Sequence, residues 1–196
     1  MRGIRDFLAR KKKENLPPRG NVRYIPPTMK LTLLMAQTLD GRIAKDSDHF
    51  PDWTEKADKK FFMDYTKEAG VMIMGRTTFE TLPGVLPGRL SVVLSRSAGD
   101  WEEREENLVF TSLAPSDILA KLQELNYDHA VLTGGTTINT LFAKEGLIDE
   151  VILTVSPVIF GEGLGVFAPE ISLDLTLEKS EKLGDNSRTL YYTVNK

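Results

Sequence analysis

Three short segments place glycines, hydroxyl side chains and arginines directly after apolar runs of strand length. They are Gly75-Arg76-Thr77-Thr78, Ser95-Arg96-Ser97 and Gly134-Gly135-Thr136-Thr137, and Thr154 lies near the end of a fourth run. Backbone N–H groups at the start of a helix and guanidinium groups both bind phosphate oxygens, because they present hydrogen-bond donors and positive charge. The recurrence of such segments predicts a site for a phosphate-rich ligand such as a dinucleotide.

A second group of residues is centred on Asp58, near the start of a predicted helix. Phe62 and Thr66 follow at helical spacing, so the three side chains share one helix face with apolar neighbours. A carboxylate on an inward face needs a partner, such as a cationic or amidine-like group of a ligand. The alternative is an acidic residue that stabilises the helix start through the helix dipole, and the pattern by itself favours this alternative.

The common nucleotide-binding motifs are missing from the sequence. No G-x-G-x-x-G occurs, since the nearest segment, residues 161–166, ends in valine where the last glycine is required. No G-x-x-x-x-G-K-[ST] segment occurs either. A dinucleotide would therefore have to bind in a way that differs from the Rossmann fold.

The segments with chemical potential lie between strands and helices that alternate along the chain. This alternation predicts a single α/β domain with a mostly parallel sheet, helices on both faces and a C-terminal antiparallel hairpin. Ligands of such sheets bind beyond the carboxyl ends of the parallel strands, where the glycine and arginine segments fall. The pattern predicts strands at 31–36, 71–74, 90–94, 108–110, 130–133, 151–155, 173–183 and 190–194, and helices at 54–69, 116–125 and 136–144, with residues 100–106 an acidic surface stretch.

Composition and charge exclude several classes of protein. The chain of 196 residues has 41% hydrophobic residues and no cysteine, which excludes disulfides and cysteine metal sites. With His49 and His129 as its two histidines, we expect no metal. No apolar run approaches the roughly 20 residues of a membrane span, so we expect a cytoplasmic protein.

The charge is distributed unevenly along the chain. Residues 1–28 carry a net charge of +6, whereas residues 29–196 carry −9. The acidic main part argues against nucleic-acid binding. We interpret residues 1–28 as a flexible basic extension, or alternatively as a docking arm for anionic surfaces, and residues 29–196 as the folded domain.

Several segments together resemble dihydrofolate reductases in residues and spacing. The resemblance starts with Trp53, Asp58, Phe62 and Thr66 and continues through Met72-Ile73-Met74-Gly75-Arg76 and Leu86-Pro87-Gly88-Arg89. Other segments resemble a sister family, the reductase domain of riboflavin biosynthesis. These are residues 38–44, 146–151 and 157–163. Both families share one fold and use NADPH, so the resemblance implies this fold and this cofactor.

The resemblance to dihydrofolate reductase implies a substrate site for dihydrofolate. Asp58 would bind the amino-pyrimidine edge of the pterin and promote its protonation through water, and Thr154 would support the same edge. Arg89 would hold the α-carboxylate of the glutamate tail, although a solvated turn arginine is the alternative. The residues implied to line the pterin and aminobenzoyl pocket are Leu34, Ala36, Phe62 and Leu82.

The same resemblance implies a second set of residues around the cofactor. Arg76 and Arg96 would select the 2′-phosphate of NADPH, and a cis peptide is expected at Gly134-Gly135. Ile43 and the loop up to Trp53 would form a mobile lid over the nicotinamide. The complete implied set is Ala36, Ile43, Gly75, Arg76, Thr77, Thr78, Leu94, Ser95, Arg96, Thr133, Gly134, Gly135, Thr136, Thr137 and Ile138.

Three residues depart from the pattern of dihydrofolate reductases. Asn139 replaces a tyrosine near the nicotinamide, Lys59 replaces an apolar residue beside the substrate, and Thr133 replaces an aliphatic residue before the glycine pair. Two alternatives therefore stay open: the ribosylamino-pyrimidine reductase of riboflavin biosynthesis, and a nucleotide-binding protein of the same fold without turnover. The sequence leaves a monomer and a homodimer equally open.

Overall fold

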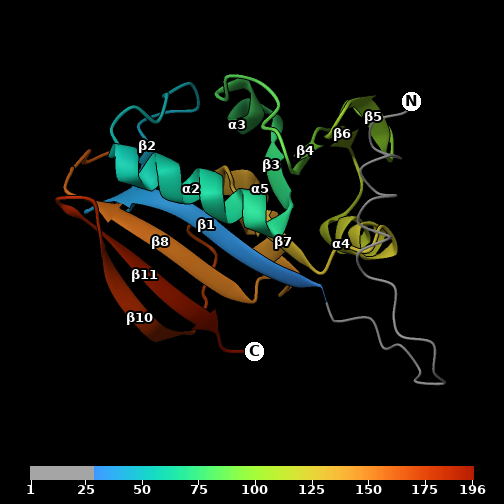
Figure 1. Ribbon diagram of the computed structural model, residues 1–196. Coiled ribbons are helices and arrows are strands. Elements are labelled where there is room, and N and C mark those ends of the chain that lie inside the picture. Colours follow the sequence, from blue (N-terminus) through green and yellow to red (C-terminus); the bar gives the residue numbers. More distant parts are fainter. Residues whose placement is uncertain (1–28) are drawn as a thin grey trace.

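A computed structural model describes residues 29–196. The predicted extension, residues 1–28, lies outside the described residues. Strands and helices alternate through the first part of the described chain, as the sequence pattern predicts, and two long strands end it (Figure 1).

A nine-stranded sheet forms the centre of the molecule, in the order β10-β11-β8-β1-β7-β3-β4-β6-β5. The strands from β8 to β6 in this order are mutually parallel, whereas β11, β10 and β5 run antiparallel to their neighbours. A separate small sheet pairs β2 with β9. The strands are β1 (Lys30–Thr38), β2 (Arg42–Ala44), β3 (Val71–Gly75), β4 (Leu90–Leu94), β5 (Glu102–Glu105), β6 (Leu108–Thr111), β7 (His129–Leu132), β8 (Glu150–Ser156), β9 (Leu164–Gly165), β10 (Leu175–Leu183) and β11 (Ser187–Val194).

Helices cover both faces of this sheet because the buried strands are apolar on both sides. Helix α2 (Lys56–Ala69) lies across one face, over β7 and β3 (Figure 1). Helices α4 (Pro115–Glu124) and α5 (Thr136–Lys144) pack together on the other face, and the single-turn helix α3 (Arg76–Glu80) follows β3.

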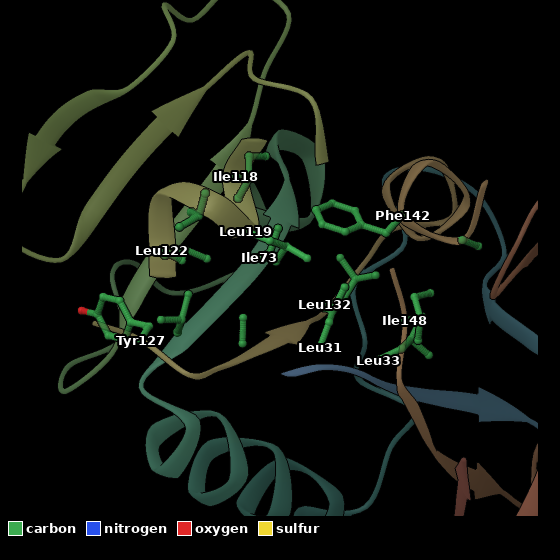
Figure 2. Packing of buried hydrophobic residues seen from close by; sticks show 14 of the residues in the cluster. Leu31, Leu33, Ile73, Ile118, Leu119, Leu122, Tyr127, Leu132, Phe142 and Ile148 are labelled. Atoms are coloured by element: carbon green, nitrogen blue, oxygen red, sulfur yellow. The ribbon is translucent and has the colours of Figure 1, made fainter. Parts of the chain in front are cut away.

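The largest core cluster lies between the sheet and the pair α4 and α5 (Figure 2). Leu31, Leu33 and Leu132 from the strands belong to one cluster with Ile118 and Phe142 from the two helices, and none of these side chains is exposed. Two smaller clusters fill the opposite face beneath α2. This packing holds the ends of the parallel strands at one edge, where the predicted site residues gather.

The sequence pattern predicted the long elements and missed the short ones. Residues 100–106, expected to be an acidic surface stretch, contain strand β5, which pairs with β6 at the sheet edge. Charged side chains are typical of an exposed edge strand because they discourage pairing with other chains. The two-residue and three-residue strands β9 and β2 were not predicted, because so few residues carry no periodic signal.

Candidate active site

A cavity of about 1680 Å³ opens at the carboxyl ends of the parallel strands and contains most of the predicted site residues. Cavities for a single small ligand measure about 300–1,000 Å³, so this one has room for a dinucleotide and a second ligand side by side. The predicted residues that line it are Leu34, Ala36, Ile43, Asp58, Phe62, Gly75, Arg76, Thr77, Thr78, Leu82, Leu94, Ser95, Arg96, Thr133, Gly135, Thr136, Thr137 and Ile138.

Asp58 lies in the first turn of α2 and lines the cavity. Its side chain is 9% exposed. Burial raises the pKa of this carboxyl above its usual value, because burial disfavours the charged form, while the hydroxyls of Thr154 and Thr54 oppose the shift. Asp58 is therefore a buried residue of the cavity wall and not an exposed residue at the start of a helix.

Thr154 lies on β8 and does not line the cavity itself. It stands opposite Ala36 of β1 and Thr189 of β11, and it is 1% exposed. Its hydroxyl is near enough to Asp58 to lower that pKa, yet it has no partner at hydrogen-bond geometry among the described residues. The two neighbouring hydroxyls, of Thr154 and Thr54, could donate only two hydrogen bonds to the Asp58 carboxylate, which can accept more than two. Asp58 therefore keeps acceptor capacity for a ligand in the cavity.

Arg89 is placed differently from the other predicted substrate residues. Its side chain is 1% exposed, and it is not part of the cavity surface. Nη1 donates to Met63 O at 2.9 Å and to Thr66 Oγ1, whereas Nε and Nη2 make only long contacts of 3.4 Å with Pro87 O. Burial lowers the pKa of this guanidinium. Arg89 is thus neither a solvated turn arginine nor a residue at the cavity wall, although the wall residue Met63 binds it directly.

The segments predicted to bind phosphate line another part of the cavity. Helix α5 begins at Thr136 after Gly135, and no side chain caps its first N–H groups, so they are available to a ligand. A Cβ atom at Gly75 would come within 2.9 Å of the Ile138 side chain. The end of β3 therefore lies so close to α5 that only glycine fits at this position without a shift of Ile138. Arg76 and Arg96 are exposed beside these segments, and Arg76 pairs with Glu80 at 2.8 Å.

The glycine pair connects two of these segments. Gly134 is not exposed to the cavity, and its carbonyl accepts a hydrogen bond from Gly75 N at 2.8 Å. The peptide bond between Gly134 and Gly135 is cis, as expected. Thr133, which precedes the pair, donates to Ile73 O at 3.2 Å and so ties β7 to β3.

The expected lid is held by two sets of contacts. Asp40 accepts hydrogen bonds from Phe160 N and Gly161 N at 3.2 and 2.7 Å, and β2, which contains Ile43, pairs with β9. The pKa of Asp40 is lowered, chiefly by the Thr38 hydroxyl. The ring of Phe160 also packs edge-on against Trp53, with the ring centroids 5.4 Å apart. The segment around Phe160 thereby anchors both ends of the loop that borders the cavity.

Two of the three departures from the dihydrofolate reductase pattern, Asn139 and Lys59, have different settings. Asn139 is fully buried and donates to Val166 O at 2.9 Å, so it fastens the segment after β9 to α5. Lys59 lines the cavity next to Asp58. The first substitution therefore has a structural partner, whereas the second changes the charge of the cavity wall.

Some cavity residues were not among the sequence predictions. Thr54 precedes Asp58 by one helical turn, and helical spacing applied backwards from Asp58 would have found it. Residues 111–115 lie at and after the end of β6, the next parallel strand along the same edge, so the strand-end rule also applied to them. Met63 and Leu86 carried no such signal, because apolar side chains are common in every core.

Within residues 29–196, no cluster of three or more His, Cys, Asp or Glu side chains is arranged to hold a metal ion. Among the same residues, no helix has the length and apolar character needed to cross a membrane.

Known proteins similar to this chain come from both expected families. A riboflavin biosynthesis protein RibD of Aquifex aeolicus is 28% identical over 197 residues, which cover 80% of this chain and 55% of that protein. A dihydrofolate reductase type 9 of Escherichia coli is 31% identical over 147 residues, which cover 74% of this chain and 76% of that protein. The chain thus spans only about half the length of the RibD relative.

Structural similarity points to the same fold. A dihydrofolate reductase from Enterococcus faecalis, solved in complex with NADP(H), superimposes with a TM-score of 0.65 and 23% identity over 85% of this chain and 97% of that one. The family model for dihydrofolate reductase matches residues 30–194, nearly the whole described part of the chain. The protein is therefore a member of the dihydrofolate reductase family.

Proposed function

We propose that the protein catalyses the NADPH-dependent reduction of 7,8-dihydrofolate to tetrahydrofolate. The observation that carries this proposal is the buried carboxyl of Asp58 on the wall of a cavity that also has apolar lining residues, with the Thr154 and Thr54 hydroxyls close to it. An amino-pyrimidine ring presents two N–H donors side by side, which match the two oxygens of one carboxylate. The apolar walls contributed by Leu34 and Phe62 suit the flat faces of such a ring.

Asp58 would hold the substrate and supply a proton to the pterin through water. Two charge-assisted hydrogen bonds orient the ring and stabilise its protonated form, which is the form that accepts a hydride. The raised pKa of Asp58 brings this carboxyl closer to the working pH than an exposed aspartate. Positioning and proton supply are therefore the tasks of this residue.

The opposite end of the cavity fits the cofactor. NADPH, when bound, supplies the hydride. The uncapped start of α5 and the close approach of Gly75 to Ile138 leave backbone donors free for a pyrophosphate. Arg76 and Arg96 would bind the 2′-phosphate, and Ile43 of β2 would cover the nicotinamide and exclude water.

Arg89 would hold the glutamate carboxylate of dihydrofolate. The two contacts of its Nε and Nη2 atoms with Pro87 O are long, so this edge of the guanidinium is only weakly satisfied. A carboxylate between Met63 and Leu86 would replace these contacts with two short, charge-assisted ones. The strong bonds of Nη1 to Met63 O and Thr66 would keep the side chain in place.

One observation favours a second candidate, the reductase step of riboflavin biosynthesis. Lys59 lines the cavity beside Asp58, where it would meet the phosphate of a ribosylamino-pyrimidine. Asp58 fits this substrate less well, because the N3 edge of a uracil presents one N–H between two carbonyl oxygens and not the two neighbouring N–H donors of an amino-pyrimidine. The similarity to RibD supports this candidate as well.

Substrate-dependent NADPH oxidation separates the two candidates. The purified full-length chain is mixed with NADPH and either dihydrofolate or the phosphoribosylamino-uracil substrate, and the loss of NADPH absorbance is followed. We expect oxidation with dihydrofolate and at most traces with the second compound. A folded, NADPH-binding protein that oxidises the cofactor only with the riboflavin-pathway compound would contradict the proposal in favour of the second candidate.

Replacing Arg76 or Arg96 with alanine is expected to reduce the preference for NADPH over NADH. A charge-assisted contact with the 2′-phosphate is worth about 10- to 100-fold in affinity, and NADH has no such group. The measurement is the KM for each cofactor, and we expect only the NADPH value to rise. Arg104→Ala is the matched control, because Arg104 is exposed on β5 and does not line the cavity. Equal losses with both cofactors would argue against a phosphate contact.

A further inference from the structure

Strand β9 is the direct neighbour of the lid strand β2. The two strands pair antiparallel, with Arg42 opposite Gly165 and Ala44 opposite Leu164. Their backbones lie in close contact, since a Cβ atom at Gly163, just before β9, would come within 2.3 Å of Ala44 O. Among the described strands, β2 and β9 form a sheet of their own, so no backbone ladder ties them to the main sheet. The placement of β2 therefore depends on what holds β9.

Helix α5 holds the segment that contains β9 through three side chains. Thr136, Asn139 and Thr140 are spaced three and four residues apart, so they share one face of the helix. All three bind the backbone of residues 165–168. The bonds join Thr136 Oγ1 to Gly165 O at 2.6 Å, Asn139 Nδ2 to Val166 O at 2.9 Å, and Ala168 N to Thr140 Oγ1 at 2.9 Å.

The bond of Asn139 differs from its two neighbours because its amide group is completely buried. Asn139 is 0% exposed, so water cannot replace the donor that Val166 O would lose. The second polar atom of the amide, Oδ1, has no hydrogen-bond partner among the described residues. A buried acceptor without a partner is unfavourable, and a leucine of the same branching would avoid this cost. Core packing therefore does not explain the asparagine, whereas its bond to Val166 O does.

We propose that Asn139 is a positioning residue for the lid. It fastens the segment after β9 to α5, and β9 in turn places β2, whose residue Ile43 lines the cavity. The inference rests on the proposed cofactor site, because the uncapped start of α5 is the part assigned to the pyrophosphate. One helix thereby holds the cofactor at its first turn and the lid through Asn139. Asn139 acts through β9 and does not line the cavity itself.

Hydrogen–deuterium exchange of the full chain tests this role directly. The Asn139→Leu variant keeps the branched shape but leaves Val166 O without a donor. We expect exchange of the amides in residues 42–44 and 164–168 to become at least about 10-fold faster, because a lost buried hydrogen bond favours local opening of these segments. The remaining strands of the main sheet should keep their wild-type rates. Unchanged exchange in residues 42–44 would overturn the proposal.

Two further variants separate a local effect from a general one. Thr140→Val removes the acceptor of Ala168 N and adds little volume, so it should loosen the same two segments. Thr32→Val is the matched control, because Thr32 is equally buried and hydrogen-bonded but lies near the start of β1 and does not line the cavity. Faster exchange of residues 42–44 in the Thr32 variant would show that β2 follows overall stability, which would overturn the proposal.

Cofactor binding provides a second readout, measured by fluorescence titration without any substrate. Asn139→Leu is expected to weaken NADPH and NADH equally, by about 3- to 10-fold, because a misplaced lid lowers the fraction of binding-competent molecules. This result differs from that expected for Arg76→Ala, which should affect NADPH alone. A loss confined to NADPH, or none, would overturn the role of Asn139. A protein that binds NADPH but does not reduce dihydrofolate would contradict the proposed function, and this test would still apply.

Discussion

Replacing Asp58 with asparagine is expected to lower kcat for dihydrofolate by about 10²- to 10⁴-fold, the usual range for a lost proton-transfer group. Asparagine keeps the size of the side chain, but it offers the amino-pyrimidine one acceptor and no charge. NADPH binding should stay unchanged, because the anion-binding segments lie at the other end of the cavity. The measurements are steady-state rates of NADPH oxidation and a fluorescence titration with NADPH alone.

Glu68→Gln provides the matched control for this variant. Glu68 lies on the same helix, is exposed and does not line the cavity, so its replacement should leave the rate unchanged. If the Asp58→Asn variant keeps the wild-type rate, Asp58 has no role in the reaction. A variant that also loses NADPH binding would indicate a general loss of structure.

The same Asp58→Asn substitution is expected to stabilise the fold at neutral and higher pH. The folded-state pKa of Asp58 is raised above its unfolded value, so its contribution to stability is complete at low pH and is lost as pH rises through the folded pKa. The ionised carboxyl therefore costs stability at pH 7, and asparagine removes this cost. Thermal melts over a pH series should show a higher Tm for the variant at neutral pH and a shrinking difference toward acid. A variant that melts lower at every pH would contradict the pKa direction.

Replacing Arg89 with lysine is expected to raise the KM for dihydrofolate by about 10- to 100-fold, because a single ammonium group cannot make the two parallel bonds of a guanidinium. Dihydropteroate, which lacks the glutamate, provides the test. If Arg89 binds the glutamate carboxylate, wild type and variant should use dihydropteroate equally well. NADPH binding should also remain unchanged in the variant.

The buried setting of Arg89 makes this comparison of substrates necessary. Its bonds to Met63 O and Thr66 hold the middle of α2 against the segment after α3, so the variant should also lose stability, by about 1–3 kcal/mol. A thermal melt measures that loss separately. Equal losses of activity with dihydrofolate and dihydropteroate would mean that Arg89 only supports the structure of the cavity wall.

Residue spacing predicted much of the cavity because parallel strands bring their carboxyl ends together. The segments after β3, β4 and β7 were expected at one edge, and the structure places Gly75, Ser95 and Gly135 in one cavity. The resemblance to dihydrofolate reductases, confirmed by the family match over residues 30–194, added the fold. The very short strands β2 and β9 escaped prediction, since two or three residues show no periodicity.

Asp58 and Arg89 illustrate what spacing leaves open. The helical pattern around Asp58 fitted a surface residue at a helix start as well as a ligand-binding one, because periodicity describes one element and not its neighbours. The structure shows that Asp58 is buried and lies close to Thr154 of β8, a strand far away in the chain. Arg89 matched the expected motif, but its guanidinium donates to Met63 O and Thr66 Oγ1 of α2 and does not line the cavity.

The alternating pattern of apolar and polar residues, together with the glycine and arginine segments, is a local property of the chain, and it is sufficient to define an α/β domain with a site at its strand ends. The order of strands across the sheet is set by packing between elements that are far apart in the chain. This order places β8 next to β1, so that Thr154 lies close to Asp58, and it places β10 at one edge of the main sheet. Local patterns contain no record of such distant neighbours, so these two features depend on the three-dimensional fold.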